Sequence, residues 1–158
     1  MANTQSMCTS FMGELMTATH NFGTAPTRAT SAADTFKGAL YLASATINAS
    51  TTAYSATGEV TGTGYSAGGV TVTNATPPTA TNSSSTAGVA YWTPSASLTY
   101  TTVTLTTAFD AVLIYNSTQS NKAVSVHTFG SQTITAGTFT LTMPSNTTTT
   151  ALLRLATT

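Results

Sequence analysis

The residues able to perform acid–base or metal chemistry are few and widely separated along this chain. The acids and histidines are Glu14, His20, Asp34, Glu59, Asp110 and His127. Transfer and hydrolysis reactions usually need a base beside a nucleophile, or two carboxylates that face one another. The four acids fall in different predicted elements, and the histidines form no HxH or HExxH motif. The sequence therefore predicts a protein that is not an enzyme and that needs neither a metal nor a cofactor.

Two further patterns have the residue types of a binding site. The glycines of Gly62-Thr63-Gly64 and Gly68-Gly69 resemble a phosphate-binding loop, but no lysine and helix follow them. We interpret them as turn glycines. A second pattern is a group of aromatic residues that could form a platform for a sugar: Tyr54, Tyr65, Tyr91 and Trp92. Aromatic residues in strands belong more often to the core, so a carbohydrate- or receptor-binding module is kept as an alternative function.

The single cysteine and the second histidine have structural interpretations. Cys8 cannot form a disulfide within one chain, and we expect it to be a small buried hydrophobic side chain. His127 alternates with Val126 on a predicted strand, which favours a solvent-facing or interface position for its ring.

Charge is nearly absent from the composition. The 158 residues include four Lys or Arg and four Asp or Glu, so the formal net charge is zero. The chain has no basic patch of Lys and Arg that could bind the phosphates of a nucleic acid. Threonine supplies 40 residues, about a quarter of the chain, and such a composition favours β-strands. The length suits one domain with a core that buries roughly 70% of the unfolded surface.

The N-terminus lacks the basic and apolar regions of a secretory signal. No apolar run approaches the ~18 residues that a membrane-spanning helix needs. We therefore expect synthesis in a cytoplasm and no membrane span.

Hydrophobic periodicity divides the chain into an N-terminal segment and a strand-rich body. Apolar residues at three- and four-residue spacing predict a short helix over residues 6–21, which Gly23 and Pro26 end. The following residues, up to 33, are expected to form a connecting arm.

Alternating apolar and polar residues predict most of the strands. These strands are expected at 34–43, 70–74, 89–93, 98–106, 111–116, 122–129, 133–135, 138–143 and 151–155, the last being a short strand or a docking tail. The continuous apolar run in 111–116 predicts a central strand covered on both faces. Turns are expected at 116–121, 130–132 and 136–137, an ordered loop with one short strand at 44–69, and an exposed, mobile connection at 77–86.

Strands at this spacing predict a mainly β protein. We expect an antiparallel β-sandwich or barrel with a short N-terminal helix or arm. Residues 1–33 would form the helix and an assembly arm, and residues 34–158 a single β domain.

Several stretches together carry a resemblance to a known family. The most specific is Glu59-Val60-Thr61-Gly62-Thr63-Gly64-Tyr65-Ser66-Ala67-Gly68-Gly69, and weaker matches lie at Phe11, Leu15, 20–22, 33–41, 109–115, 129–130 and 135–141. In these stretches the chain resembles a family of small structural proteins encoded by tailed bacteriophages.

The resemblance implies a virion component and no enzyme. We expect a capsid decoration or cement protein, a homotrimer that binds the major capsid protein on the surface of the head after synthesis in the cytoplasm of a host bacterium. A tail tube, adaptor or fibre-base component is the alternative. A neutral, Thr-rich surface suits crowded copies, because it avoids charge repulsion between them.

Two regions are candidate contacts for such an assembly. The expected contact residues are Phe11, Leu15 and Met16 in the N-terminal segment, and Glu59 and Tyr65 in the glycine-rich loop 58–69. A helix as short as the N-terminal one is marginal alone, so it either docks on a neighbour or caps its own sandwich. In the loop, Val60 and Tyr65 are expected to pin an ordered subunit contact. Glu59 is expected to meet Lys37 or Arg28 there.

Overall fold

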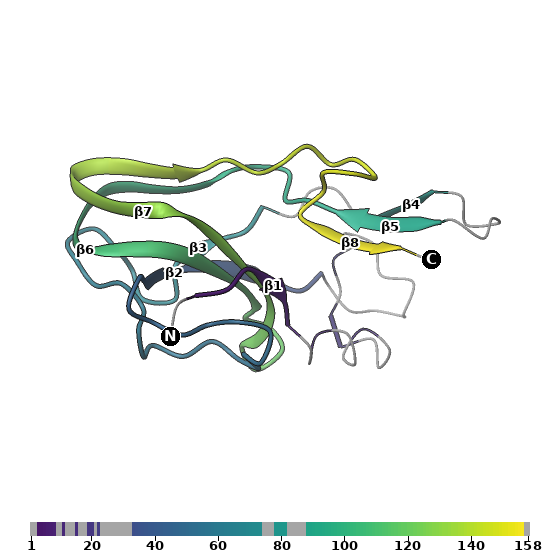
Figure 1. Cartoon of the computed structure of the whole chain (residues 1–158), viewed down its shortest axis with the longest axis horizontal. Coiled ribbons are helices and arrows are strands. Elements are labelled where there is room, and N and C mark those ends of the chain that lie inside the picture. The colour runs from purple at the N-terminus through teal and green to yellow at the C-terminus, as the bar shows by residue number, and fades with distance from the viewer. Residues whose placement is uncertain are drawn as a thin grey trace.

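The structure is a computed structural model that describes residues 3–8, 11, 15, 19–20, 22, 33–73, 78–81 and 88–156. It is mainly β and antiparallel, as the sequence predicts, and its strands form two sheets, neither of which closes into a barrel. A larger sheet occupies one end of the molecule and a small sheet projects at the other (Figure 1).

Eight strands make up these sheets. They are β1 (Ser6–Met7), β2 (Phe36–Leu42), β3 (Val70–Thr71), β4 (Thr79–Thr81), β5 (Val89–Trp92), β6 (Leu98–Asn116), β7 (Lys122–Leu141) and β8 (Leu153–Ala156). The larger sheet has the order β1-β7-β6-β2-β3 and the small sheet the order β4-β5-β8. The strands at β2, β5 and β8 and the turn between β6 and β7 confirm the sequence predictions at those positions.

The long β6–β7 hairpin folds back on itself and supplies both layers of a sandwich. Gly38 of β2 pairs with Ile114, near the end of β6. Tyr100, near the start of β6, donates a hydrogen bond of 2.8 Å from its hydroxyl to the carbonyl oxygen of Gly38. The first half of β6 therefore lies across the face of the sheet that its own second half helps to build, and the fold of the hairpin is visible in Figure 1.

Aromatic packing between the two halves of the hairpin fills the space between the layers. Phe139, near the end of β7, packs edge-on against Phe109 with ring centroids 5.1 Å apart. It also contacts Phe129 at 5.3 Å. Such contacts add about 0.5–1.5 kcal/mol per pair beyond the area they bury.

The bend is made by an uneven register. Leu105 pairs with Ile134 and Phe109 with Gln132, so residues 106–108 of β6 lie opposite the single residue Thr133 of β7. All three of these β6 residues are exposed, as expected on the outside of a bend. Extra residues on one strand of a pair bend it and increase its twist.

The turns predicted at 130–132 and 136–137 are wrong, because β7 runs through both. The strands predicted at 122–129, 133–135 and 138–143 are likewise one strand, and those at 98–106 and 111–116 merge into β6. Ala136 has φ of 46° and Thr102 has φ of 53°, so single residues in the left-handed region absorb the irregularity without reversing the chain.

The N-terminal helix is correct only in part. Ser6 and Met7 form a strand that pairs with Val126 and Ser125 of β7, so the helix does not begin at residue 6. Phe11 and Leu15 are helical, and much of 9–21 lies outside the described residues. Strand pairing wins at residues 6–7 because the edge of β7 offers unpaired backbone groups there.

The connection predicted at 77–86 is also wrong in part. Thr79–Thr81 form β4, which pairs with Val89–Tyr91 of β5, while 82–87 lie outside the described residues. A run of small polar residues gives little signal for a strand that has only one neighbour. By contrast, residues 111–116 are all buried, which confirms a strand covered on both faces.

Replacement of Ala136 by Gly should stabilise the protein. A residue with a Cβ in the left-handed region costs about 1 kcal/mol, and glycine removes that cost. We expect the free energy of unfolding in urea to rise by up to about 1 kcal/mol. Ala108→Gly is the matched control, because Ala108 is also exposed on a long strand but lacks a positive φ. It should lower stability, and a fall in both variants would contradict the left-handed geometry at Ala136.

Candidate functional site

The glycine-rich loop 58–69 is structured and joins the two layers of the sandwich. Val60 is buried and donates its backbone N–H to the carbonyl oxygen of Leu40 in β2. Thr63 pairs with Thr104 in the first half of β6. The predicted ordered loop with Val60 as an anchor is confirmed, and its position explains why it is ordered: both ends lie against β2, and its middle pairs with the first half of β6.

A buried carboxylate organises this loop. Glu59 is 6% exposed and accepts three short hydrogen bonds from uncharged groups. Tyr54 donates its hydroxyl to Oε2 at 2.6 Å, Tyr65 donates its hydroxyl to Oε1 at 2.7 Å, and the backbone N–H of Gly68 also donates to Oε1 at 2.7 Å. Hydrogen bonds to an ionised acceptor are roughly twice as strong as neutral ones.

The tyrosines around Glu59 form a connected network on β2 and the second half of β6, and the ring of Tyr65 stacks at 5.9 Å on that of Tyr100 in the other layer. The hydroxyl of Tyr65 accepts the backbone N–H of Leu40 at 3.0 Å, and that of Tyr115 donates to the carbonyl oxygen of Gly68 at 2.8 Å. Burial, with the nearby Glu59 charge as a further cause, raises the pKa of Tyr54, Tyr65 and Tyr115. Burial raises the pKa of Tyr41 to about 12. The hydroxyls therefore stay protonated and able to donate at neutral pH.

Glycine is required where the loop touches the sheet. Gly69 has φ of 73°, and a Cβ there would overlap the carbonyl oxygen of Gly38. Gly64 has φ of 78°, and a Cβ there would overlap the carbonyl oxygen of Thr102. The most specific stretch of the resemblance is thus a set of residues that this loop needs for its own geometry.

Glu59 and Tyr65 were expected to be assembly contacts, and the structure places them in this internal network. The expected partner of Glu59 was Lys37 or Arg28. Its carboxylate oxygens instead accept from two hydroxyls and a backbone N–H, and Arg28 lies outside the described residues. Sequence spacing gave no sign of neutral donors, because Tyr54 and Tyr65 reach Glu59 only when the loop is folded. Whether the outer side of the loop meets another subunit stays a prediction.

The described residues of the N-terminal segment pack on their own chain. Phe11 is 2% exposed, and its ring lies 4.8 Å from that of His20 and 5.9 Å from that of Phe22. Leu15 is half-buried, and Met16 lies outside the described residues. The burial of Phe11 favours the alternative in which this segment caps its own sandwich.

A polar cluster that sequence reasoning missed fixes this segment to the end of β6. The buried Asn116 donates its amide group to Oδ2 of Asp34 at 2.7 Å and lies 3.1 Å from Nδ1 of His20. Its side-chain oxygen accepts the backbone N–H groups of Thr118 and Gln119. The sequence predicts Asn116 as the last residue of the strand 111–116 and the first of the turn 116–121, and this position at the end of an apolar run is the only signal it offers.

The aromatic residues considered for a sugar platform belong to two separate clusters. Trp92 is buried, with its ring 4.7 Å from that of Phe22. Tyr54 stacks on Tyr115 at 4.7 Å, beside Glu59. The structure therefore does not bring the four rings onto one face.

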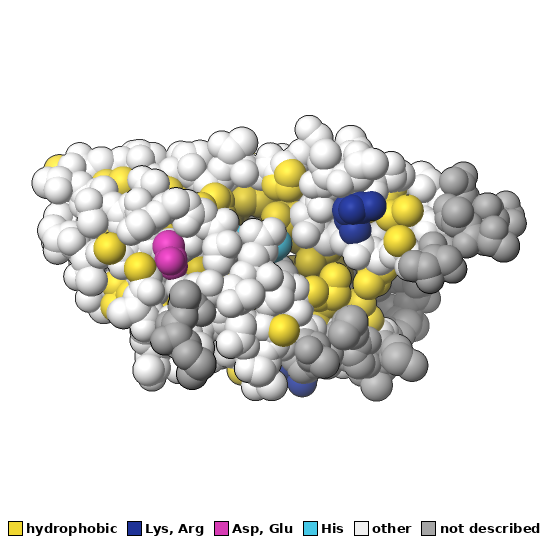
Figure 2. All heavy atoms as spheres, viewed as in Figure 1, with side chains coloured by type: hydrophobic (Ala, Val, Ile, Leu, Met, Phe, Trp, Pro, Cys, Tyr) yellow, Lys and Arg dark blue, Asp and Glu magenta, His cyan; other side chains and the backbone are white. Residues whose placement is uncertain are grey.

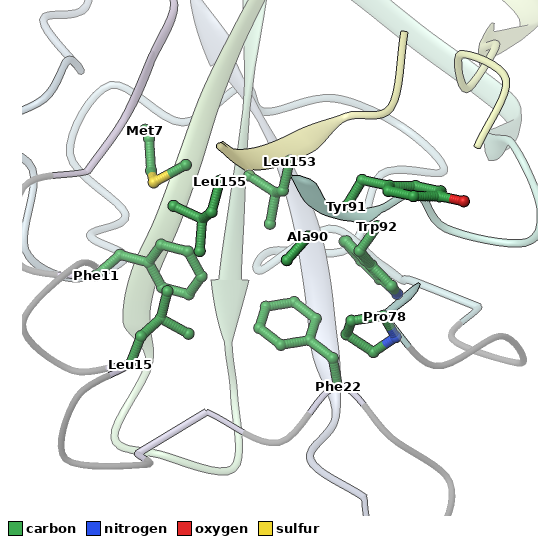
Figure 3. A pocket seen from close by; sticks show the side chains of 10 residues that line it. All are labelled: Met7, Phe11, Leu15, Phe22, Pro78, Ala90, Tyr91, Trp92, Leu153 and Leu155. Carbon is green, nitrogen blue, oxygen red and sulfur yellow. The ribbon is translucent and has the colours of Figure 1, made fainter. Parts of the chain in front are cut away.

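An apolar groove separates the larger sheet from the small one. Its lining comes from the N-terminal segment, β5 and β8, and includes Met7, Phe11, Leu15, Phe22, Pro78, Ala90, Tyr91, Trp92, Leu153 and Leu155 (Figure 3). Leu155 is 43% exposed. Figure 2 shows hydrophobic side chains along this hollow and very few charged ones on the same face.

A serine–histidine pair lies in a second groove nearby. Oγ of Ser125 is 2.8 Å from Nε2 of His127, both on β7. This spacing is that of a nucleophile and its base. However, Ser125 is 1% exposed, and no carboxylate lines the groove. The sequence predicts a solvent-facing or interface position for His127; the residue is half-buried beside this groove, and burial lowers its pKa to about 4. The pair can exchange a hydrogen bond, but a substrate could not reach Ser125 without opening of the groove.

Among the residues that the structure describes, no group of three or more His, Cys, Asp or Glu side chains is placed to hold a metal ion. No helix within the described ranges is long and apolar enough to cross a membrane. No family model, no curated protein and no solved structure matches this chain. The function is therefore argued from the geometry and from the resemblance in sequence.

Replacement of Glu59 by Gln should weaken the connection between the layers. The amide NH₂ cannot accept a hydrogen bond, so at least one buried donor loses its partner, at a cost of about 2–3 kcal/mol. Urea unfolding measures this loss, and a double-mutant cycle with Tyr65→Phe should show coupling between the two sites. Tyr91→Phe is the control, since the Tyr91 hydroxyl points away from the groove (Figure 3). The network would be contradicted if the three substitutions lowered stability equally and if the effects of Glu59→Gln and Tyr65→Phe simply added.

Replacement of Gly69 by Ala should be far more harmful than the same change at Gly130. At Gly69 the new methyl group meets backbone and requires a left-handed residue, whereas at Gly130 nothing lies within 4 Å. We expect Gly69→Ala to lose at least about 2 kcal/mol of stability and Gly130→Ala to change it by less than about 1 kcal/mol. Similar unfolding midpoints for the two variants would show that the loop does not lie against β2.

Proposed function

We propose that this chain is a structural component of a bacteriophage virion, and specifically a decoration or cement protein on the outside of the capsid. The proposal rests on the resemblance in sequence, and the geometry is compatible with it. Residues 59–69, the most specific stretch of the resemblance, build a connection between the two layers of the sandwich. Such a connection suits a protein whose function is structural. Copies of the chain are proposed to assemble as a homotrimer on the major capsid protein.

The observation that best supports an assembly function is the outer edge of β7. Within the described residues, β1 is the strand that pairs with this edge, at Ser125 and Val126, and residues 122–124 bond to the loop at 52–53 and to Cys8. From His127 to Leu141, β7 contains no Lys, Arg, Asp or Glu and no proline. Proteins that must stay monomeric usually protect such an edge with lysine, proline or a covering element.

An unprotected strand edge can add a strand from another chain. Its backbone N–H and C=O groups supply affinity, while the exposed Thr138 and Thr140 can pair across strands without charge repulsion. Many weak contacts of this kind become strong when copies are arrayed on a particle. The bulge at Ala136 limits how far such pairing can extend.

Density on purified particles tests the proposal directly. We expect copies of this chain at regular positions on the capsid surface. Copies found only along the tail would replace the capsid assignment by the alternative, a tail tube, adaptor or fibre-base component. Absence from particles would overturn the virion assignment altogether.

Lysine substitutions test the strand edge as the contact. Thr138→Lys with Thr140→Lys should reduce incorporation into particles by about tenfold or more, because charges at a strand edge oppose pairing. Thr106→Lys with Thr107→Lys, at the exposed bend, adds the same charge elsewhere and is the control. Equal incorporation of both variants, with folding verified by circular dichroism, would exclude the edge as a contact.

A further inference from the structure

A second groove, lined by both polar and apolar residues, lies between the larger sheet and the segment that leads into β8 of the small sheet. One wall is residues 125–127 of β7 and part of β1, and the other is residues 151–154, which lead into β8. Leu153 on that wall pairs with Trp92 of β5. Any separation of residues 151–154 from β7 therefore moves β8, and with it the environment of Trp92.

His127 is the one titratable group on the β7 side of this groove among the residues that line it. Its Nε2 is paired with the neutral Oγ of Ser125, and the residue opposite it on β6 is the apolar Val112. A protonated ring has two N–H donors, of which Ser125 can accept only one. The closed groove thus offers a charged His127 a single neutral partner.

The neighbouring charges do not compensate for this. Arg154, at the exposed rim of residues 151–154, lines the same groove and carries a positive charge. Gln5 and the two residues of β1, Ser6 and Met7, also line the groove and are uncharged. On β6 the nearby acid is Asp110, whose Oδ1 is already bound by the side-chain amide of Asn3 at 2.6 Å.

We propose that this groove is an acid-sensitive connection, in which protonation of His127 releases residues 151–154 from β7 and lets the small sheet separate from the larger sheet. Apart from residues 6–7 and 125–127, the larger sheet lies outside the groove, as do the bend in the β6–β7 hairpin and the Glu59 network, so they stay folded when it opens. The inference concerns the isolated chain and does not depend on the proposed virion function.

The direction of the pH dependence follows from burial. The pKa of His127 falls from 6.5 to about 4 in the closed groove, whereas in an open groove the ring is solvated and regains its ordinary value. Between these two values the open state binds a proton that the closed state does not. The closed state is therefore fully favoured above the ordinary pKa, and the ratio of open to closed molecules rises by about tenfold for each unit of pH decrease within that window.

The single tryptophan of the chain is a built-in reporter for this opening. Trp92 is buried, and its ring lies 4.7 Å from that of Phe22 and 6.3 Å from that of Phe36 in β2. We expect its fluorescence emission to shift to longer wavelength as the pH falls from 6.5 towards 4, while the far-ultraviolet circular dichroism of the larger sheet is unchanged. Amide hydrogen exchange should become faster in β5 and β8 but not in β2 or β6.

Three substitutions distinguish opening of this groove from other effects of acid. His127→Gln keeps a polar group near the Nε2 position but cannot be protonated, so the Trp92 transition should move down by about one pH unit or more. His20→Asn keeps an acceptor near the Nδ1 position of the other histidine and should leave the midpoint unchanged. Arg154→Gln should move the midpoint in the same direction as His127→Gln, but less.

A Trp92 transition with the same midpoint in the wild type and in His127→Gln would overturn the proposal. So would a transition that coincides with loss of the circular dichroism signal in the wild type, since the whole chain would then be unfolding. If His127→Gln fails to fold, Arg154→Gln on the exposed rim still decides the matter, because an unchanged midpoint there and unchanged hydrogen exchange in β8 at low pH contradict acid opening.

Discussion

The length of the β6–β7 hairpin is the constraint on which the rest of the fold depends. Strands of 19 and 20 residues would extend about 65 Å if straight, whereas a compact chain of this size has a radius of gyration of about 15 Å. The hairpin must therefore bend, and the bend places Leu98 and Tyr100 over Gly38. Because Gly38 has no side chain, the two layers approach closely enough for Tyr100 to bond its backbone.

The bend leaves one side of the β6–β7 hairpin uncovered, and the loop 58–69 covers that side. The loop is held there almost entirely by hydrogen bonds, among them those from uncharged groups to Glu59, and not by ion pairs. The charge of Glu59 is balanced by hydroxyl and backbone donors, and the tyrosines that donate are themselves fixed to β2 and to the loop. This arrangement suits a chain with eight charged residues, four of each sign. It also leaves the outer surface neutral, which is the property on which the proposed assembly depends. The same scarcity of charge makes protonation of the half-buried His127 a strong perturbation.

The fold class could be predicted from the sequence, and so could the strands whose two faces differ in polarity. The contacts between distant parts of the chain could not. Alternation located β2 and β5, and the apolar run located the buried half of β6, because these signals depend on local residues. The continuity of β7 could not be predicted, since Gly130 and Ala136-Gly137 have turn-forming composition and only the partner strand keeps the chain extended there. The partners of Glu59 were hidden because they meet it only when its own loop is folded, and those of Asn116 because they lie 82 and 96 residues away in the sequence.

Nuclear Overhauser contacts in solution test the folded hairpin most directly. The account predicts contacts from the Gly38 Hα protons to the side chains of Leu98 and Tyr100, and between the rings of Phe109 and Phe139, in the same molecule in which Gly38 also contacts its strand neighbour Ile114. If Gly38 shows contacts to Ile114 but none to Leu98 or Tyr100, the hairpin is not folded over β2. The two-layer architecture, and with it the function of the loop 58–69, would then be contradicted.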